Sequence, residues 1–392
     1  MAPPTKKPIG SKLLKSINQQ KVLRIIFTHG SVSRVQLSEL TGLTQQTITN
    51  IVNRLLDEGL LKEKHPIASN SGRRPIPLVI QSEKLLAIGI EISVTYIKGT
   101  LMNFNRHIIK EIEIEVSEYQ DEEGTIEYAR QVIDQLLEHV PEHAKLNGIG
   151  CSIQGLVDSK QGIVLYSSGL RWRNFPLKKR LEEEYDIPVY LENDVNLLAL
   201  AENLNGRLSD SQNNVTIKLD TGVGGAIVFN KQLHAGSNHV AGEIGHYKSF
   251  MGKEAYDCHC GGRGCLTTLA SVSGLKHNAG YSVEQLRDLY EKRDPHAVQL
   301  YTSVETSVTM AISNIITLLN PDHVLLTGMM FDVLGEPFLS AIQKSVMHTI
   351  PETCRKVNII CLPKTPTESA SAVGLVMNHF YDVPLDTLVQ GI

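Results

Sequence analysis

The sequence predicts an α/β protein in which a small, basic and mostly helical N-terminal domain precedes a two-lobed α/β body. Three observations support this: the charge is unevenly distributed, apolar residues near the N-terminus follow a helical spacing, and two similar pairs of β-rich runs recur along the chain. At 392 residues the chain is also longer than one hydrophobic core normally allows. We expect domains over residues 1–84, 85–197 and 198–367, with residues 368–392 rejoining the first lobe.

The charge distribution separates the N-terminal domain from the body. Residues 1–84 carry 13 Lys and Arg against 5 Asp and Glu, whereas the remainder carries 25 against 37. Such asymmetry favours a polyanionic partner for the basic end, although a basic tail without a partner would look similar. No apolar stretch is long enough to span a bilayer, and the first residues lack the apolar core of a secretory signal. We therefore expect a cytoplasmic protein without a membrane partner.

Two short helices are predicted at the start of the chain. Apolar residues from Ile17 to Phe27 form an imperfect helical stripe that ends at Gly30. Ser33 followed by Gln36 is a capping-box pattern, which predicts that a second helix begins there. This helix is expected to turn two leucines inward and to end at a glycine: Leu37, Leu40 and Gly42.

A third helix follows, with Thr44 as its expected N-cap and Gly59 as its end. Its apolar residues keep the i, i+3, i+4, i+7 spacing: Ile48, Ile51, Val52 and Leu55. The outward face is rich in amides, which can donate and accept at base edges in the major groove of DNA. The alternative is a small bundle with an arbitrary polar face. The residues expected to contact DNA are Gln45, Gln46, Thr47, Thr49, Asn50 and Arg54.

Two short strands joined by a polar loop are predicted after this helix, over LLKEKHPIASNSGRRPIPLVI. The loop carries Arg73 and Arg74 on a Gly/Ser background, so both could lie against phosphates or enter a narrow minor groove; a solvated basic turn is the alternative. Three helices followed by such a hairpin predict a winged helix-turn-helix.

The body begins each lobe with the same plan, a β-rich run, a turn and a second β-rich run. The two copies are LLAIGIEISVTYIKGTLMNFN and VTIKLDTGVGGAIVFNKQLH. Duplicated hairpins of this kind are typical of two-lobed actin-like ATPase bodies, and the β-rich and helical runs that alternate around them indicate an α/β fold.

Several motifs together resemble the repressor branch of the ROK family, which comprises repressors, uncharacterised reading frames and sugar kinases. The winged helix with SGRRP is followed by LENDVNLLALAE, DTGVGGAIV, AGEIGH, CHCGGRGC and NPDHVLLTG. The resemblance covers nearly the whole chain. It implies an actin-like, sugar kinase-like body that binds a sugar.

The phosphate loop of the first hairpin departs from the pattern of the family's kinases. Those kinases carry an Asp-x-Gly-Gly-Thr turn, whereas this chain has residues 91–95, Glu-Ile-Ser-Val-Thr. Side chains at Ser93 and Val94 add Cβ atoms where the backbone should approach phosphates closely. Since phosphoryl transfer depends on positioning, we expect no ATP-dependent kinase activity. The second loop, with Asp220 before its glycines, is expected to serve as a tight hairpin.

The resemblance places a sugar site at four polar residues, Asn193, Asp194, Glu243 and His246. In a kinase of the family the residue matching Asp194 would be the general base; here we expect it only to accept a sugar hydroxyl. The alternatives are a helix cap at Asp194 and an ordinary polar turn at 243–246. Two departures leave the effector open, because Thr267 stands where the family commonly has Glu and 154–155 is Gln-Gly instead of Pro-Gly.

A cysteine cluster predicts a structural zinc site. Cys258, Cys260 and Cys265 surround a Gly-rich turn, and His246 completes a Cys₃His set, with His259 as the rival imidazole. Free reduced cysteines are the alternative. Zinc would be structural, and one ring nitrogen of His246 would hold it while the other faces the sugar. The remaining cysteines lie in apolar runs and are expected to be buried thiols: Cys151, Cys354 and Cys361.

Three functions remain in competition. The first is a sugar-responsive repressor of carbohydrate uptake or catabolism genes, a homodimer or tetramer on a palindromic operator in double-stranded DNA, with a sugar or sugar phosphate as effector. The second is an ATP-dependent sugar kinase with a DNA-binding head. The third is a constitutive DNA-binding protein whose body only dimerises. The first is favoured because it uses both the winged helix and the altered phosphate loop.

Overall fold

A computed structural model describes residues 11–64, 76–116, 121–362 and 367–381. The chain divides into two compact units. Unit 1 comprises residues 1–151, 177–191 and 372–392, and unit 2 comprises 152–176 and 192–371. These boundaries differ from the predicted domain ranges, since residues 152–176 and 192–197 group with the second unit and the winged helix groups with the first lobe. Within the described ranges, no helix has the length and apolarity needed to cross a membrane.

The N-terminal domain has the predicted three helices and hairpin, with one additional short strand. Its elements are α1 (Ser11–His29), β1 (Val32–Ser33), α2 (Arg34–Thr41), α3 (Gln45–Asp57), β2 (Leu61–Glu63) and β3 (Pro77–Ile80). The strands form an antiparallel sheet in the order β1-β3-β2. The loop that joins β2 to β3, with Arg73 and Arg74, lies outside the described residues.

The predicted helix ends are confirmed. Ser33 and Gln36 form a capping box, Gly42 ends α2 in the left-handed conformation at φ 72°, and the Thr44 side chain caps α3. The prediction that Leu40 turns inward is wrong, because its side chain is 49% exposed. Thr41 takes the inward place instead, since it lies one turn after Leu37 and donates its hydroxyl to the Leu37 carbonyl oxygen.

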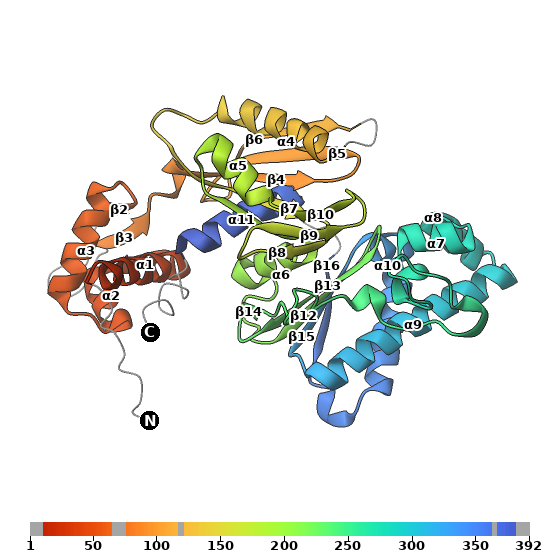
Figure 1. Cartoon of the computed structure of the whole chain (residues 1–392). Coiled ribbons are helices and arrows are strands. Elements are labelled where there is room, and N and C mark those ends of the chain that lie inside the picture. The colour runs from red at the N-terminus through yellow and green to blue at the C-terminus, as the bar shows by residue number, and fades with distance from the viewer. Residues whose placement is uncertain (1–10, 65–75, 117–120, 363–366, 382–392) are drawn as a thin grey trace, which may run out of the picture. The chain divides into compact units, whose positions relative to one another are not determined.

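The first lobe is built on a five-stranded sheet in the order β11-β7-β4-β5-β6. Its strands are β4 (Leu85–Ile92), β5 (Tyr96–Asn103), β6 (Ile108–Glu115), β7 (Lys145–Ile153) and β11 (Val189–Asn193), and η1 (Ser82–Lys84) precedes them. Strands β4 and β5 form the predicted hairpin. Helix α4 (Glu122–Leu137) lies along one face of this sheet (Figure 1).

Further elements follow the strands of the first lobe or lie between them in the chain. They are β8 (Leu156–Asp158), β9 (Ile163–Ser167) and β10 (Trp172–Phe175), which form a small antiparallel sheet, and the helices α5 (Leu177–Tyr185), α6 (Asp194–Asn205) and α11 (Glu368–Tyr381). Because β11 ends at Asn193 and α6 begins at Asp194, two of the four predicted sugar residues lie at a strand-to-helix junction.

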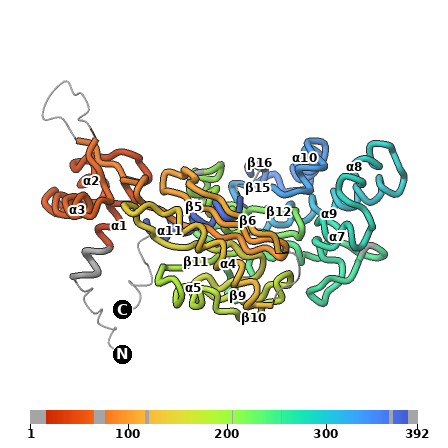
Figure 2. Tube along the Cα trace, turned by 90° about the horizontal axis from the view of Figure 1, so that it is seen from above, coloured from red at the N-terminus to blue at the C-terminus, as the bar shows by residue number. Residues whose placement is uncertain are grey.

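The second lobe contains a five-stranded sheet in the order β14-β13-β12-β15-β16. Its strands are β12 (Asn214–Leu219), β13 (Val223–Phe229), β14 (Gln232–Leu233), β15 (His323–Thr327) and β16 (Asn358–Leu362). The helices of this lobe are α7 (Val272–Ala279), α8 (Val283–Glu291), α9 (Pro295–Leu319) and α10 (Met329–Thr349), with short 3₁₀ turns η2 (Ile244–His246), η3 (Gly252–Glu254), η4 (Leu266–Thr268) and η5 (Glu352–Cys354). Helices α8, α9 and α10 pack against one another (Figure 2).

The side chains of strand β12 alternate between an apolar face and a polar face of the second sheet. Val215, Ile217 and Leu219 belong to the main core, which includes residues of α9 and α10. Because successive side chains of a strand point to opposite faces, Thr216 and Lys218 point to the other face, where α6 packs. The fold therefore directs a lysine of a buried strand towards the beginning of α6.

Candidate functional site

Helix α3 presents the predicted polar face. Gln45, Gln46 and Asn50 are exposed, and the Gln46 side chain donates to the Asn50 side chain at 3.3 Å. The Thr49 hydroxyl donates to the Gln45 carbonyl oxygen. Exposed amides on a helix of this kind can reach base edges in a major groove.

Two of the predicted DNA contacts have partners within the domain. Thr47 lies in the first turn of α3, where its hydroxyl is 2.9 Å from that of Thr44 and its amide donates to the Thr44 side chain. Arg54 lies 4.0 Å from Glu58, one turn further along the helix. Their predicted DNA contacts stay predictions, as do those of Arg73 and Arg74 outside the described residues.

Asn193 is the N-cap of α6, a role that the sequence had suggested for Asp194. Its side-chain oxygen accepts hydrogen bonds from the amides of Val195 and Asn196, at 2.9 and 3.1 Å. Its side-chain nitrogen donates to the Gly155 carbonyl oxygen at 3.0 Å and to Asp194 Oδ1 at 3.1 Å. Since an asparagine amide has two hydrogens and two acceptor positions, Asn193 is fully hydrogen-bonded here and orients Asp194.

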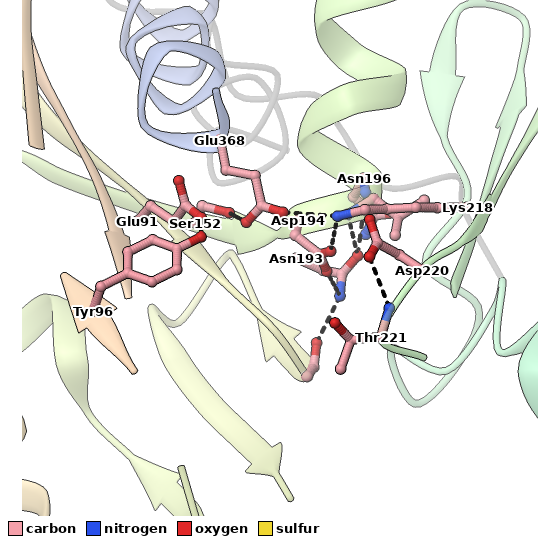
Figure 3. A network of polar contacts seen from close by, with 12 residues as sticks. Glu91, Tyr96, Ser152, Asn193, Asp194, Asn196, Lys218, Asp220, Thr221 and Glu368 are labelled. Carbon is pink, nitrogen blue, oxygen red and sulfur yellow. Dashed lines mark hydrogen bonds and ion pairs between the residues drawn. The ribbon is translucent and has the colours of Figure 1, made fainter. Parts of the chain in front are cut away.

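Asp194 forms an ion pair with a lysine that the sequence analysis did not single out. Figure 3 shows Lys218 between Asp194 and Glu368, with its Nζ 3.0 Å from Asp194 Oδ2 and 2.7 Å from Glu368 Oε1. The Ser152 hydroxyl donates to the other oxygen of Glu368 at 3.1 Å. Burial lowers the pKa of Lys218, but the charges of Asp194 and Glu368 outweigh it and raise this pKa above its ordinary value. The lysine is therefore charged at neutral pH.

The first hairpin also holds its carboxylate internally. Glu91 is buried at the end of β4, and the Tyr96 hydroxyl donates to its Oε1 at 2.5 Å (Figure 3). The turn is closed by a hydrogen bond from the Ser93 amide to the Tyr96 carbonyl oxygen. Val94, at the tip of the turn, is 40% exposed. The turn that stands where kinases of the family carry their phosphate loop is thus closed by its own backbone, and its carboxylate accepts a hydrogen bond from a tyrosine.

Gly225 of the second hairpin and two glycines of the AGEIGH segment allow close backbone packing. A Cβ at Gly225 would lie 2.7 Å from the Gly242 carbonyl oxygen, and one at Gly242, where φ is 96°, would lie 2.3 Å from the Gly225 oxygen. A Cβ at Gly245 would lie 2.3 Å from the Val223 oxygen. These contacts press the AGEIGH segment against β13 and so position Glu243 and His246.

His246 faces two groups through its two ring nitrogens. Nδ1 lies 3.6 Å from Cys258 Sγ, and Nε2 lies 3.6 Å from Glu243 Oε2. Burial, followed by the nearby charges of His259 and Lys248, lowers the pKa of His246, so the ring is neutral at neutral pH, the form that binds metals. Partial desolvation and then the charge of Asp194 raise the pKa of Glu243, whose side chain is 45% exposed.

The predicted metal ligands come together in space. One ligand atom from each of four residues lies within 4.8 Å of the other three: His246, Cys258, Cys260 and Cys265. The Cys260 and Cys265 sulfurs are 3.6 Å apart, close to the roughly 3.8 Å edge of a tetrahedron with Zn–S bonds of about 2.3 Å. Three sulfurs and one imidazole are the donors of a closed structural zinc site, so this set fits the metal.

Backbone hydrogen bonds hold the cysteine turn in shape. The Cys258 amide donates to the Gly262 carbonyl oxygen, and the Gly261 amide donates back to Cys258. A backbone hydrogen bond from Gly262 lowers the pKa of Cys260, while burial raises that of Cys258 to about 11. Lys248 Nζ lies 2.7 Å from Cys265 Sγ. Outside the cluster, Cys151 is buried as predicted, whereas Cys354 and Cys361 are only half-buried.

Sequence reasoning missed Lys218, Glu368 and Tyr96. One signal was available, because a lysine within the apolar strand VTIKL has to find a buried partner. Glu368 is 150 residues away in sequence and gave no such signal.

Comparison with known proteins assigns two regions of the chain. The ROK family profile matches residues 87–377, and a winged helix-turn-helix DNA-binding profile matches residues 15–62. The chain is 29% identical to a putative xylose repressor of Caldicellulosiruptor sp., over 85% of this chain and 88% of that one. It is 28% identical to the xylose repressor of Bacillus subtilis (94% and 97% covered) and to the Escherichia coli regulator NagC (84% of each).

Solved structures share the fold. A ROK family transcriptional regulator described as a homologue of the E. coli MLC protein superposes with a TM-score of 0.83, at 23% identity, over 96% of this chain and all of that one. A ROK hexokinase from Thermus thermophilus covers 74% of this chain and 96% of its own, with a TM-score of 0.63 and 20% identity. The regulator thus matches nearly the whole chain, and the kinase only about three quarters of it.

Proposed function

Because the chain belongs to the ROK family, we propose that it is a sugar-responsive transcriptional repressor of carbohydrate uptake or catabolism genes. In this proposal the winged helix binds a palindromic operator in double-stranded DNA, and the body binds a sugar through Asp194, Glu243 and His246, with Asn193 holding Asp194. The chain acts in the cytoplasm as a homodimer, so that two heads meet the two half-sites. The observation that carries the proposal is that one chain contains both an exposed amide face on α3 and a body in which Lys218 forms an ion pair with Asp194.

Two features argue against kinase activity. Asp194, which a kinase would need as a base, is ion-paired with Lys218, and Glu91 accepts a hydrogen bond from Tyr96. In addition, Ser93 and Val94 occupy the two positions where the family's kinases have the glycines that let backbone amides approach phosphates. The site nevertheless keeps what a sugar needs, which is carboxylates held in place and able to accept hydroxyl hydrogens.

Zinc in the Cys₃His cluster is part of the proposal. When bound, it would fix the turn 258–265 and, through His246, the segment that carries Glu243. Its role would be structural, since four protein ligands close the coordination shell.

An operator-release experiment tests the repressor proposal. The full-length protein would select a binding site from double-stranded oligonucleotides with a random core, and the selected DNA would then be titrated with protein in the presence of D-xylose, N-acetylglucosamine, other sugars and their phosphates. We expect a two-fold symmetric site and at least one sugar that changes its affinity by about tenfold or more. A symmetric site whose affinity no sugar alters would leave a constitutive DNA-binding protein.

An ADP-release assay tests the kinase alternative. With ATP, Mg²⁺ and each hexose or pentose we expect no turnover above the background without sugar. Turnover abolished by Asp194→Asn would show that the chain is a kinase with a DNA-binding head.

A further inference from the structure

Lys218 is an unusual residue for a strand whose other residues are all buried. Its side chain is only 11% exposed, and lysine is rarely buried unless it is paired. The two carboxylates that meet it are the first residues of two different helices, Asp194 of α6 and Glu368 of α11. One ammonium group therefore joins residues of three elements, and all three residues belong to unit 2.

Each carboxylate in this cluster uses both of its oxygens. Asp194 gives Oδ2 to Lys218 and Oδ1 to the Asn193 amide, whereas Glu368 gives Oε1 to Lys218 and Oε2 to the Ser152 hydroxyl. Asp220 adds a further negative charge that favours the charged form of Lys218. The ammonium is thus surrounded by more negative than positive charge, and two of its three hydrogens are already donated.

Two carboxylate oxygens that converge on one point from separate elements are also what a divalent cation requires. Mg²⁺ and Mn²⁺ are held at phosphate-transfer sites by one or two carboxylates together with the phosphates of a nucleotide. Here that point is occupied by Lys218 Nζ, at 3.0 and 2.7 Å from the two oxygens. A cation placed between Asp194 and Glu368 would have to displace the ammonium at a large electrostatic cost.

We propose that Lys218 is a specificity-determining residue: its ammonium is a built-in counter-ion that takes the place of a divalent cation between Asp194 and Glu368. The site consequently admits an uncharged, hydroxyl-bearing ligand and rejects metal-nucleotide complexes. Lys218 also holds the Asp194 carboxylate in position as an acceptor for a hydroxyl. The part that concerns the ligand rests on the proposed sugar site, whereas the exclusion of divalent cations does not.

Manganese binding tests the exclusion directly, without an identified sugar. The full-length, zinc-loaded protein is titrated with Mn²⁺, and free Mn²⁺ is measured by electron paramagnetic resonance. We expect no Mn²⁺ at this cluster in the wild type, and in Lys218→Ala a new site that binds at least about tenfold more tightly than any wild-type site and that disappears in the double variant with Asp194→Asn. Lys231→Ala, which removes an exposed lysine of the same unit, is the control and should behave as the wild type.

Lys218→Ala leaves a cavity, which could prevent folding. A second variant therefore provides the same test if Lys218→Ala does not fold. Lys218→Gln keeps most of the side-chain length and offers Mn²⁺ an amide oxygen, and we expect it to gain the same site. Folding is checked by circular dichroism. Methylammonium should raise the melting temperature of Lys218→Ala and leave that of Lys231→Ala unchanged, because the small cation can occupy the vacated position.

Two results would overturn the inference. One is a folded Lys218 variant that binds Mn²⁺ no better than the wild type. The other is wild-type Mn²⁺ binding that Asp194→Asn abolishes. Failure of the sugar screen would instead count against the proposed function and would leave the role of Lys218 as counter-ion standing, so the two failures are distinguishable.

Discussion

Two polar clusters in the second unit hold their charges in opposite ways. In the cysteine cluster, three sulfurs and His246 point at one another around a space that suits a metal ion. In the Lys218 cluster, Asp194 and Glu368 point at an ammonium group supplied by the chain itself. The first arrangement offers donors to a cation from solution, whereas the second carries its cation in the sequence.

The difference shows where this chain can respond to its surroundings. A site completed by zinc is rigid only while the metal is bound, and its stability follows metal supply and pH. A site completed by a buried lysine keeps its charge balance whatever ions are present. We infer that the cysteine cluster supports the proposed sugar site, while the Lys218 cluster determines which ligands that site accepts.

The largest effect is expected from breaking the cysteine cluster. Cys258→Ser should abolish stoichiometric zinc and lower the free energy of unfolding by roughly 3–5 kcal/mol, because ligand binding and folding are coupled in such sites. Metal content is measured by mass spectrometry and stability by urea unfolding. The control is Cys354→Ser, a half-buried cysteine outside the cluster, which should keep its zinc. Full zinc occupancy in Cys258→Ser would show that His259 or another donor completes the site.

A smaller effect is expected at the residue that links the two clusters. Glu243 lies 3.6 Å from the His246 nitrogen that faces away from Cys258, and burial, followed by the charge of Asp194, raises the pKa of Glu243. Glu243→Gln should weaken zinc binding by roughly 10–100-fold, because a carboxylate behind a metal-bound histidine orients the ring and increases its basicity. Competition with a chromophoric chelator measures the change. Glu291→Gln, at an exposed position on α8, is the control; equal affinities in the two variants would mean that the clusters are independent.

Local rules predicted much of the fold. The capping box at Ser33, the Thr44 cap and both hairpins followed from backbone hydrogen bonding and alternation, which act over a few residues. The clustering of the four potential metal ligands was predictable as well, because three of them lie within eight residues of one another. The prediction for Leu40 failed because either of two positions in a short helix, three or four residues after Leu37, can face the same side. In the folded domain Thr41 is buried and Leu40 is exposed.

The Lys218 cluster was not predictable in the same way. Its members come from β12, the start of α6 and the start of α11, and only the tertiary fold brings them together. The odd lysine in VTIKL indicated a buried partner but not which carboxylate it would be. Asp194 was expected at the sugar site from the resemblance, yet its ion pair changes what it can do there, because a carboxylate committed to an ammonium is a poor general base.

A third polar cluster, around Asp322, is expected to give the smallest effect, and it holds its carboxylate with neither a metal nor a lysine. Asp322 accepts hydrogen bonds from the Ser211 hydroxyl and from the amides of Gln212 and Asn213, at 2.9 and 3.0 Å for the amides, and lies 2.8 Å from His323 Nδ1. Burial raises its pKa, but these hydrogen bonds outweigh burial and lower the pKa to about 2 from 3.8.

Because the pKa of Asp322 is lower in the folded protein than in the unfolded chain, its carboxylate stabilises the fold at pH values above the unfolded pKa. This contribution is lost as the pH falls from about 4 through about 2. Because the Asp322 side chain is 39% exposed, solvent screening reduces the contribution to about 1 kcal/mol. Asp322→Asn should therefore lower stability by about that amount at pH 7 and flatten the acid limb of the stability curve, as measured by urea unfolding between pH 2 and 7. Asp210→Asn, at an exposed position nearby, should leave the limb unchanged. If the acid limb of the stability curve were the same in Asp322→Asn as in the wild type, hydrogen bonds alone would not stabilise the charged form of Asp322. Stabilising a charged carboxylate in this unit would then require a cation, as at Lys218.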